Sequence, residues 1–272
     1  MALTEIVEQT EQTEQPALAQ PESVRRQIRR PVPLPRLLSP RERTSWLRFG
    51  VLMAAGALPV TAIPLYIVGV LPMSWAALLV IPLMVAKAVL IKRGSSEGWW
   101  AGQGMIAGLV GVTAYDGLRL PMAYLTDLWP DFIPRLGGWI TETDSNVPVG
   151  YLWRYIGDGG GIGVAFFVFC GALMKFWPSL VRSRPVTLAI GYGVFVWLGL
   201  IGTVVLLPRG QEFLFVPTAA ILVLSLLGHL IYGAVLGLFL ARIVRRTEAT
   251  KTTSVTTTRR TLPTQRTASH AK

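Results

Sequence analysis

The stretch that decides the fold is VPTAAILVLSLLGHLIYGAVLGLFLARIV, residues 216–244. Arg242 is its only Lys, Arg, Asp or Glu. About 20 consecutive apolar residues are enough for a helix to cross the roughly 30 Å of hydrocarbon in a bilayer. Backbone groups in lipid must be satisfied within the segment, which an α-helix does. The stretch therefore predicts a transmembrane helix.

Further apolar segments of comparable length precede this stretch. They lie at residues 49–71, 73–91, 99–125, 151–177 and 186–207. Of the 272 residues, 51% are hydrophobic and 15% are charged, whereas soluble domains carry about 25% charged residues. We therefore predict an all-α fold, a polytopic transmembrane helical bundle of six spans.

Both ends of the chain differ in composition from its middle. Residues 1–47 contain the near-repeat TEIVEQTEQTEQ and then the Arg-rich and Pro-rich stretch RRQIRRPVPLPRLLSPRER, while residues 246–272 are rich in Thr. Such sequences bury too little apolar surface to offset the entropy of ordering. We predict disordered basic tails at 1–47 and 246–272, attracted to anionic lipids, around a transmembrane domain at 48–245.

Loop charges predict the orientation of the spans. If the N-terminus is cytoplasmic, the outer connections hold only Arg135 and Arg209 as basic residues, beside five acidic ones. The inner connections then hold most of the basic residues, namely Arg41, Arg43, Arg48, Lys92, Arg93, Lys175, Arg182, Arg184, Arg242, Arg245 and Arg246. The positive-inside rule therefore predicts that both termini are cytoplasmic.

The same charges predict where the protein resides. The first apolar segment begins near residue 49, too late for a cleavable signal peptide, so the first span is expected to direct its own insertion. A net charge of +11 is also found in nucleic-acid-binding proteins, but here the basic residues flank apolar spans. We expect the cell inner (cytoplasmic) membrane as the location and no nucleic acid as a partner.

Charged side chains inside the third and fourth spans are the first candidates for function, because a charge in a membrane span costs several kcal/mol by insertion scales. AYDGLRLP places Asp116 and Arg119 three residues apart, and WRYIGDGGG places Arg154 and Asp158 four residues apart. Each spacing puts two opposite charges on one helical face. We predict a net-neutral cluster of four charges near the outer third of the bilayer.

Two interpretations of this cluster remain open. Buried ion pairs commonly fix helix register and need no substrate. Intramembrane charges also bind polar ligands or relay protons, and Arg154 is near enough to the interface to extend toward it. Gly104, Gly108 and Gly111 form a stripe that favours close approach of the third and fourth spans.

Glycines crowd the fourth span directly after its charges. The sequence GGGIG follows Asp158, and the whole set is Gly157, Gly159, Gly160, Gly161 and Gly163. One interpretation is very close helix packing. The other is a helix interruption that lines a cavity, as in transporters.

The sixth span contains SLLGHLIYGAVLG, in which Ser225, His229 and Tyr232 share one helical face. A mid-span histidine can be a proton relay or a ligand, or a neutral residue that hydrogen-bonds between helices. Lys87, near the inner end of the second span, is expected to extend along the surface to the membrane edge.

No sequence pattern indicates a cofactor or an enzyme. Nucleophile elbows, phosphate-binding loops, dinucleotide fingerprints, haem-binding pairs and paired histidines are absent from the sequence. His229, His270 and Cys170 are the only nitrogen or sulfur side chains suited to a metal, and a single cysteine forms no intrachain disulfide. We expect no metal, no cofactor and no catalytic residue.

Two motifs resemble those of a group of uncharacterised bacterial multi-pass membrane proteins. The first is a glycine-striped span that ends Tyr-Asp-x-x-Arg, here Tyr115, Asp116 and Arg119. The second is Gly-His-x-x-Tyr-Gly, here from Gly228 to Gly233. The group has no known activity, so the resemblance implies a bacterial membrane protein and no mechanism.

Two functions follow as hypotheses. The first is a structural or accessory membrane component, whose buried Asp and Arg side chains specify packing or a partner subunit. The second is a transporter or channel-like protein, with a polar site between the third, fourth and sixth spans. A cavity that reaches Asp158 would favour the second, and a sealed cluster with every charge paired would favour the first.

Overall fold

The computed structural model describes residues 40–261, and the side chains of residues 41–247. This part of the chain is helical between its turns and loops, with no strand, which confirms the predicted all-α class. The helices are α2 (Pro40–Ile67), α3 (Met73–Lys92), α4 (Ser96–Leu125), α5 (Ile133–Thr141), α6 (Val147–Leu152), the π-helix η1 (Trp153–Gly159), α7 (Gly160–Phe176), α8 (Pro178–Ser183), α9 (Pro185–Leu206), α10 (Gly210–Phe213) and α11 (Ala219–Thr261).

Five described helices are long and apolar enough to cross a membrane. They are Arg41–Ile67 within α2, α3, the continuous helix Val147–Phe176 made of α6, η1 and α7, α9, and Ala219–Thr247 within α11. The remaining predicted span, α4, has 30 residues, but its glycines and the charged Asp116 and Arg119 lower its hydropathy. Large apolar side chains face outward from these helices, such as Phe195 with 68% of its surface exposed. Such a surface suits lipid better than water.

Two helices extend beyond the predicted spans. The structure has α2 beginning at Pro40 rather than at residue 49, and α11 continuing to Thr261 across the domain boundary predicted at residue 245. Most of the predicted N-terminal tail and the last residues of the C-terminal tail lie outside the described residues.

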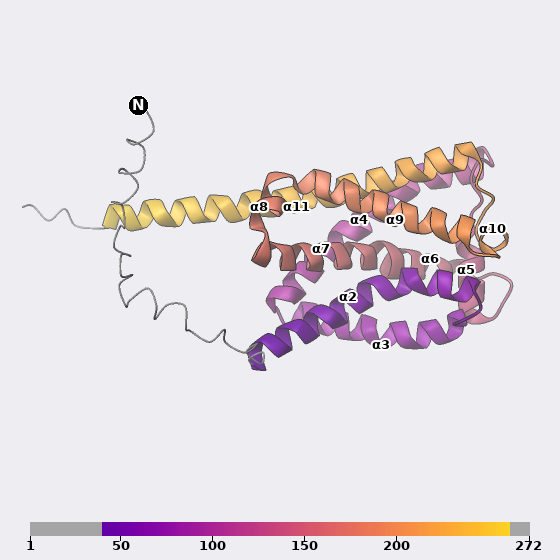
Figure 1. Cartoon of the computed structure of the whole chain (residues 1–272), viewed down its shortest axis with the longest axis horizontal. Helices are drawn as coiled ribbons and strands as arrows, with labels where there is room; N and C mark the ends of the chain where they lie inside the picture. The colour runs from indigo at the N-terminus through magenta and orange to yellow at the C-terminus, as the bar shows by residue number, and fades with distance from the viewer. Residues whose placement is uncertain (1–39, 262–272) are drawn as a thin grey trace, which may run out of the picture. The chain divides into compact units, whose positions relative to one another are not determined.

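The helix α7 occupies the centre of the unit that begins at Arg41, between α2 on one side and α9 with α11 on the other (Figure 1). Its closest neighbour is α4, and α11 packs in turn against α9 and α4. Most side chains of α7 are accordingly buried, Phe166 and Phe167 almost completely, whereas Phe169 and Phe176 are exposed. A helix that is apolar on every face, as α7 is, belongs in such a central position.

Glycines permit the contact between α4 and α7. A Cβ atom on Gly163 would lie 2.3 Å from the carbonyl oxygen of Gly104, and one on Gly108 would lie 2.4 Å from that of Gly159. The other glycines of the fourth span also meet neighbours, Gly161 at α2, Gly160 at Met105 and Gly157 at Pro59. The chain stays helical through these glycines. Their surroundings agree with the close-packing interpretation.

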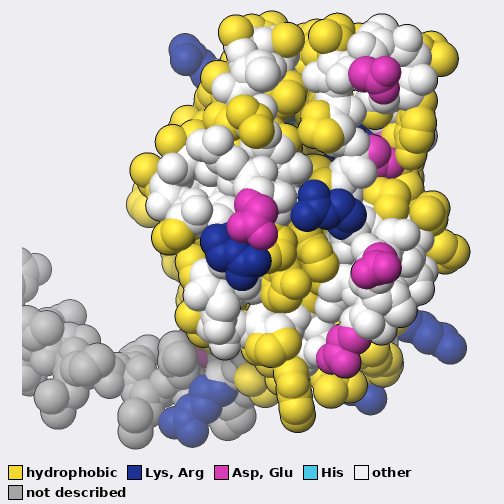
Figure 2. Space-filling view, turned by 90° about the vertical axis from the view of Figure 1, so that its right-hand side faces the viewer, with side chains coloured by type: hydrophobic (Ala, Val, Ile, Leu, Met, Phe, Trp, Pro, Cys, Tyr) yellow, Lys and Arg dark blue, Asp and Glu magenta, His cyan; other side chains and the backbone are white. Residues whose placement is uncertain are grey.

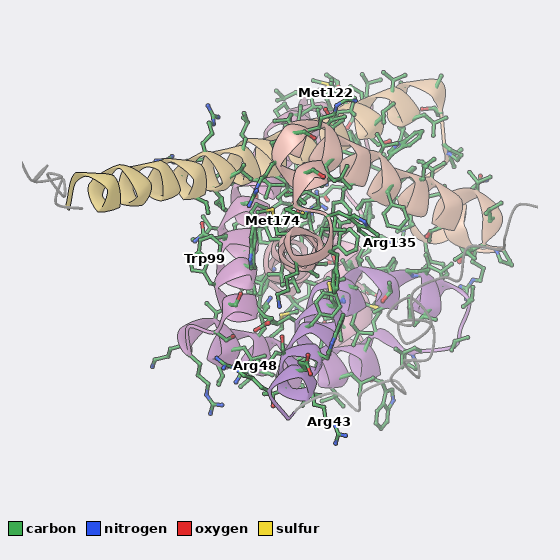
Figure 3. All side chains as sticks on the ribbon, turned by 60° about the vertical axis from the view of Figure 1, so that its left-hand side comes forward. Arg43, Arg48, Trp99, Met122, Arg135 and Met174 are labelled. Atoms are coloured by element: carbon green, nitrogen blue, oxygen red, sulfur yellow. The ribbon has the colours of Figure 1, made fainter. Side chains whose placement is uncertain are left out.

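The two ends of the helical unit carry different charges. The first turns of α2, the end of α3 and α8 lie at one end, with Arg43 and Arg48 projecting from α2 and Trp99 from α4 (Figure 3). The opposite end is formed by α5, α10 and their connections. Figure 2 shows this opposite end, where acidic side chains and a few basic ones lie among hydrophobic side chains. Most basic residues of the described helix ends and connections therefore lie at the end where α2 begins, and Arg135 and Arg209 lie at the other end.

Lys87 is buried, so the expectation that it extends to the membrane edge is wrong. Only 4% of its surface is exposed, and its Nζ lies 3.8 Å from Sδ of Met105 in α4. The side chain points into the contact between α3 and α4 instead of along the outer surface. A thioether is a weak hydrogen-bond acceptor, so the amine has little to compensate its removal from water.

Replacing Lys87 with methionine is expected to stabilise the protein. Methionine has a side chain of similar length but lacks the poorly compensated amine. Removing that amine from the interior should raise the free energy of unfolding by about 1–3 kcal/mol. Thermal unfolding of the purified protein in detergent, followed by circular dichroism, should show a raised Tm. Lys92→Met, at an exposed position at the end of α3, is the matched control and should leave Tm nearly unchanged. A lower Tm for Lys87→Met would contradict this reasoning.

Candidate functional site

Asp116 is the centre of a buried ionic cluster. Its Oδ1 accepts hydrogen bonds from Nε of Arg119 at 3.0 Å and from Nη2 of Arg154 at 3.1 Å. Asp116 and Arg119 expose only 1% and 2% of their surfaces. The pair three residues apart on α4 forms as predicted, and Arg154 reaches it from η1. The third and fourth predicted spans therefore face each other at their charged residues.

Asp131 joins this cluster, although sequence reasoning did not identify it. Its Oδ1 accepts a hydrogen bond from Nη1 of Arg119 at 2.8 Å, and its Oδ2 accepts from the hydroxyls of Tyr124 at 2.7 Å and Tyr151 at 2.8 Å. Arg119 is thus bound to two carboxylates, Asp116 and Asp131. Burial raises the pKa of Asp131, but the hydrogen bonds from Arg119, Tyr124 and Tyr151 outweigh it, so the pKa lies below its usual value.

The loop before α5 brings Asp131 into place by folding over the helices. Trp129 and Ile133 are each only 2% exposed, and Leu136 is fully buried. In the sequence, only the apolar content of this segment indicated that it packs on the helices, because apolar loop side chains are buried when the loop caps a bundle. No sequence pattern matches Asp131 to Arg119, since the path of a loop is not periodic.

Asp158 is not part of the ionic cluster, which corrects the predicted group of four charges. No ion pair joins it to Arg154 among the described side chains, and its buried Oδ1 has no hydrogen-bond partner there. Arg154 instead extends to Asp116, with its guanidinium carbon 4.7 Å from the centre of the Tyr115 ring. The indole of Trp153 lies near Asp158, yet its Nε1 also lacks a hydrogen-bond partner in this part of the chain.

Arg154 and Asp158, the candidate pair of the predicted fourth span, both lie in the π-helix η1. A π-helix closes its hydrogen bonds from residue i to i+5 and so accommodates one extra residue in a turn, a distortion that is frequent at functional sites. Tyr232 of α11 supports the end of this turn, because its hydroxyl donates to the carbonyl oxygen of Gly159 at 2.6 Å. Tyr232 is therefore a structural hydrogen-bonding residue of the site.

His229 presents a hydrogen-bond acceptor to the interior. Its Nδ1 lies 2.7 Å from the carbonyl oxygen of Ser225, and because a carbonyl only accepts, Nδ1 must carry the proton. In a neutral imidazole Nε2 is then an acceptor. The ring packs edge-on against Tyr115, with the two ring centres 5.1 Å apart. His229 and Arg154 thus meet the same aromatic ring.

A cavity of about 420 Å³ brings four of the candidate polar residues together, and Asp116 does not line it. Its polar wall contains Arg119, Arg154, Asp158 and His229. The rest of the wall is mostly apolar, from α2, α7 and α9, and the loops around Trp129 and Phe215 close one end. Tyr232 and the glycines Gly157, Gly159, Gly160, Gly161 and Gly163 are not in this wall.

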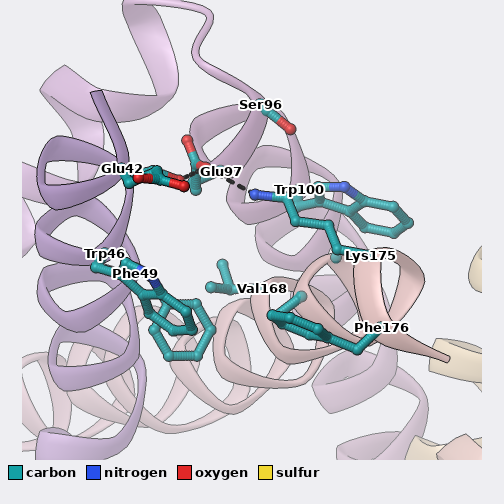
Figure 4. A pocket seen from close by; sticks show the side chains of 12 residues that line it. Glu42, Trp46, Phe49, Ser96, Glu97, Trp100, Val168, Lys175 and Phe176 are labelled. Carbon is teal, nitrogen blue, oxygen red and sulfur yellow. Dashed lines mark hydrogen bonds and ion pairs between the residues drawn. The ribbon is translucent and has the colours of Figure 1, made fainter. Parts of the chain in front are cut away.

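A second cavity, of about 180 Å³, lies near the basic end between α2, α4 and α7 (Figure 4). The carboxylate of Glu97 projects into it and accepts hydrogen bonds from Ser45 at 2.5 Å and from Lys175 at 3.4 Å. The Lys175 side chain is 56% exposed. Since the carboxylate is already bound within the protein, this cavity is a weaker candidate for a ligand site.

The described side chains do not form a metal site. No three His, Cys, Asp or Glu among them are grouped closely enough to hold a metal ion. Cys170 is buried as a free thiol in α7. The candidate site is therefore a set of charged and aromatic side chains around a mostly apolar cavity.

Comparison with known proteins finds no match among protein-family models, curated proteins or solved structures. The resemblance at the Tyr-Asp-x-x-Arg and Gly-His-x-x-Tyr-Gly motifs remains a prediction from the sequence. The function of the chain must therefore be argued from the geometry of the site itself.

Proposed function

We propose that the chain is a six-span protein of a bacterial inner membrane, with α4 as the additional span and both termini in the cytoplasm. The segregation of basic residues to the end where α2 begins supports this orientation. The same basic end is suited to anionic lipid headgroups. The polar side chains of α4 suit a span that is surrounded by other helices, since its Asp116 and Arg119 are buried.

A transporter-like function is the one that the site supports best, with a ligand held in the large cavity between α4, η1 with α7, and α11. One observation carries this proposal: the cavity reaches Asp158, which has no ion pair and whose buried Oδ1 has no hydrogen-bond partner among the described residues. Burying an unpaired charge is expensive, and such groups in membrane spans mark substrate or ion pathways. A bundle built only for packing would gain stability with an apolar residue at this position.

A structural or accessory role is the second candidate, and the ionic cluster favours it. Asp116, Arg119, Arg154 and Asp131 form ion pairs with one another, as expected of groups that specify helix packing or a contact with a partner subunit. This role accounts for the cluster but leaves both the cavity and Asp158 without an explanation.

Thiol accessibility separates the two candidates. Cys170 would first be replaced by alanine, and single cysteines would then be placed at His229, in the cavity wall, and at Ser225, one turn away on α11 and fully buried. N-ethylmaleimide should modify His229→Cys in the purified folded protein and leave Ser225→Cys unmodified. Equal protection of both cysteines would indicate a sealed bundle and would contradict the transporter-like function.

The orientation has its own test in intact cells. A membrane-impermeant thiol reagent should label a cysteine at Glu142, in the connection after α5, but not one at Arg182 in α8. The reverse pattern would invert the proposed topology without affecting the assignment of the cavity.

A further inference from the structure

We propose that the cavity binds an amphiphilic amine, with its ammonium group at Asp158 and its apolar body between α2 and α9. This inference rests on the proposed transporter-like function and names the chemical class of its ligand. It comes from three features of the cavity: its charge balance, its free hydrogen-bonding groups and its side opening.

The charges around the cavity leave one negative charge uncompensated. Arg119 is bound to Asp116 and Asp131, and Arg154 is bound to Asp116. These two cations and two carboxylates balance one another. Asp158, with 5% of its surface exposed, remains without an ion pair among the described residues. A bound cation would complete the balance, and burial makes such pairing strongly favourable compared with leaving the carboxylate alone.

Two polar groups of the wall are acceptors that need a donor, and Nε of Arg154 is a buried donor without a hydrogen-bond partner among the described residues. The buried Oδ1 of Asp158 has no hydrogen-bond partner within the described part of the chain, and Nε2 of His229 is an acceptor by the tautomer that the carbonyl oxygen of Ser225 imposes. A protonated amine carries several N–H donors and a positive charge, so it can serve both kinds of acceptor. Aromatic rings of Trp129 and Phe132 also line the cavity, and aromatic rings attract cations. The ring of Tyr115 already has the guanidinium of Arg154 against it.

An anionic ligand fits these surroundings poorly. The guanidinium of Arg119 already donates to Asp116, Asp131 and Tyr151. A phosphate or carboxylate at Arg154 would compete with Asp116 and would lie beside the unpaired Asp158. Like charges at such distances in a poorly hydrated site repel strongly.

The side opening of the cavity explains why the amine should carry an apolar body. Its outer rim includes Thr61 of α2 and Gly199 of α9, which are exposed, and Phe195, which is 68% exposed. Both helices are apolar enough to cross a membrane, so this rim faces the region that hydrocarbon would occupy. Val60, Ile63, Val196 and Leu200 extend the apolar wall inward from the rim. A ligand that partitions into the bilayer could therefore enter sideways between α2 and α9.

The test measures binding of a long-chain alkylamine that carries a dansyl group at its far end, using the full-length protein in phosphatidylcholine vesicles. The matched probe has the same chain with its amine acetylated, which removes the charge. The amine should bind saturably and the acetylated probe about tenfold or more weakly, since acetylation removes the charge that pairs with the buried carboxylate. Asp158→Asn should weaken binding of the amine to the same extent, whereas Glu212→Gln on the exposed end should not.

Equal binding of the two probes, or unchanged binding to a folded Asp158→Asn variant, would overturn the proposal. If Asp158→Asn fails to fold, His229→Phe tests the same site, because it keeps an aromatic ring against Tyr115 and removes the acceptor. Weaker amine binding to this variant is expected, and unchanged binding would overturn the role of His229. Thiol labelling at His229→Cys without amine binding would leave the transporter-like function standing and reject only this ligand class.

The same assay distinguishes a lipid from a free amine as the source of the ligand. The probe would also be added to protein reconstituted in vesicles that contain phosphatidylethanolamine. If it binds more weakly there than in pure phosphatidylcholine vesicles, the cavity accepts a lipid whose headgroup is a primary amine. If it binds equally in the two membranes, the cavity selects free amphiphilic amines. Either result agrees with recognition of an ammonium group, and weaker binding in the phosphatidylcholine vesicles, whose headgroup has no N–H donor, would contradict it.

Discussion

Replacing Arg119 with methionine is expected to lower the free energy of unfolding by about 3–5 kcal/mol. The change leaves the buried carboxylates of Asp116 and Asp131 without the guanidinium that binds both of them. Arg154 still reaches Asp116, but no other guanidinium pairs with Asp131 among the described residues. The loss should appear as a lower midpoint when the purified protein is unfolded with SDS and followed by circular dichroism.

Arg135→Met is the matched control for this prediction. Arg135 is exposed and donates one hydrogen bond, to the backbone of Glu212, so its loss should cost less than about 1 kcal/mol. In a double-mutant cycle, Asp116→Asn and Arg119→Gln would be compared singly and together. The double variant should regain only part of the stability lost by the single variants, because Arg154 and Asp131 each still lose a charged partner. Equal stability of Arg119→Met and Arg135→Met would contradict the structural account of the cluster.

Replacing Gly163 with alanine is expected to destabilise the protein by up to about 3 kcal/mol, the upper part of the usual range for overpacking. The added Cβ would lie 2.3 Å from the carbonyl oxygen of Gly104 and 2.7 Å from Cα of Gly108. Both atoms belong to backbone, so no side chain can turn away to make room. The helices α4 and α7 would have to separate, which would also disturb the contact between Arg154 and Asp116.

Replacing Gly163 with alanine has two opposite effects on stability: the added Cβ overpacks the helix contact, and alanine favours the helical conformation. Alanine favours a helix by about 1 kcal/mol over glycine, so a glycine without close neighbours should respond in the other direction. Gly191 of α9 provides that comparison, because a Cβ there would meet nothing within 4 Å. We expect Gly191→Ala to raise Tm slightly and Gly163→Ala to lower it clearly. A raised Tm for both variants would contradict the close contact of the two helices.

The sequence by itself determined the helical class and most of the helix positions. Apolar runs of about 20 residues have few stable arrangements in a bilayer, so composition and length were sufficient. The pair Asp116 and Arg119 also followed from sequence, since a spacing of three residues on one helix fixes its geometry locally. The burial of Lys87 did not follow, because its surroundings depend on how α3 packs against α4.

Only the tertiary structure decided which charges remain unpaired. Arg154 had two carboxylates within reach of its long side chain, and the contact between α4 and η1 directed it to Asp116 rather than to Asp158. Asp131 entered the cluster through a loop whose path has no periodicity. The cavity arises from the relative positions of α2, α7, α9 and α11. Local spacing places two residues on one helical face, whereas rotation and separation between helices depend on the packing of the whole unit.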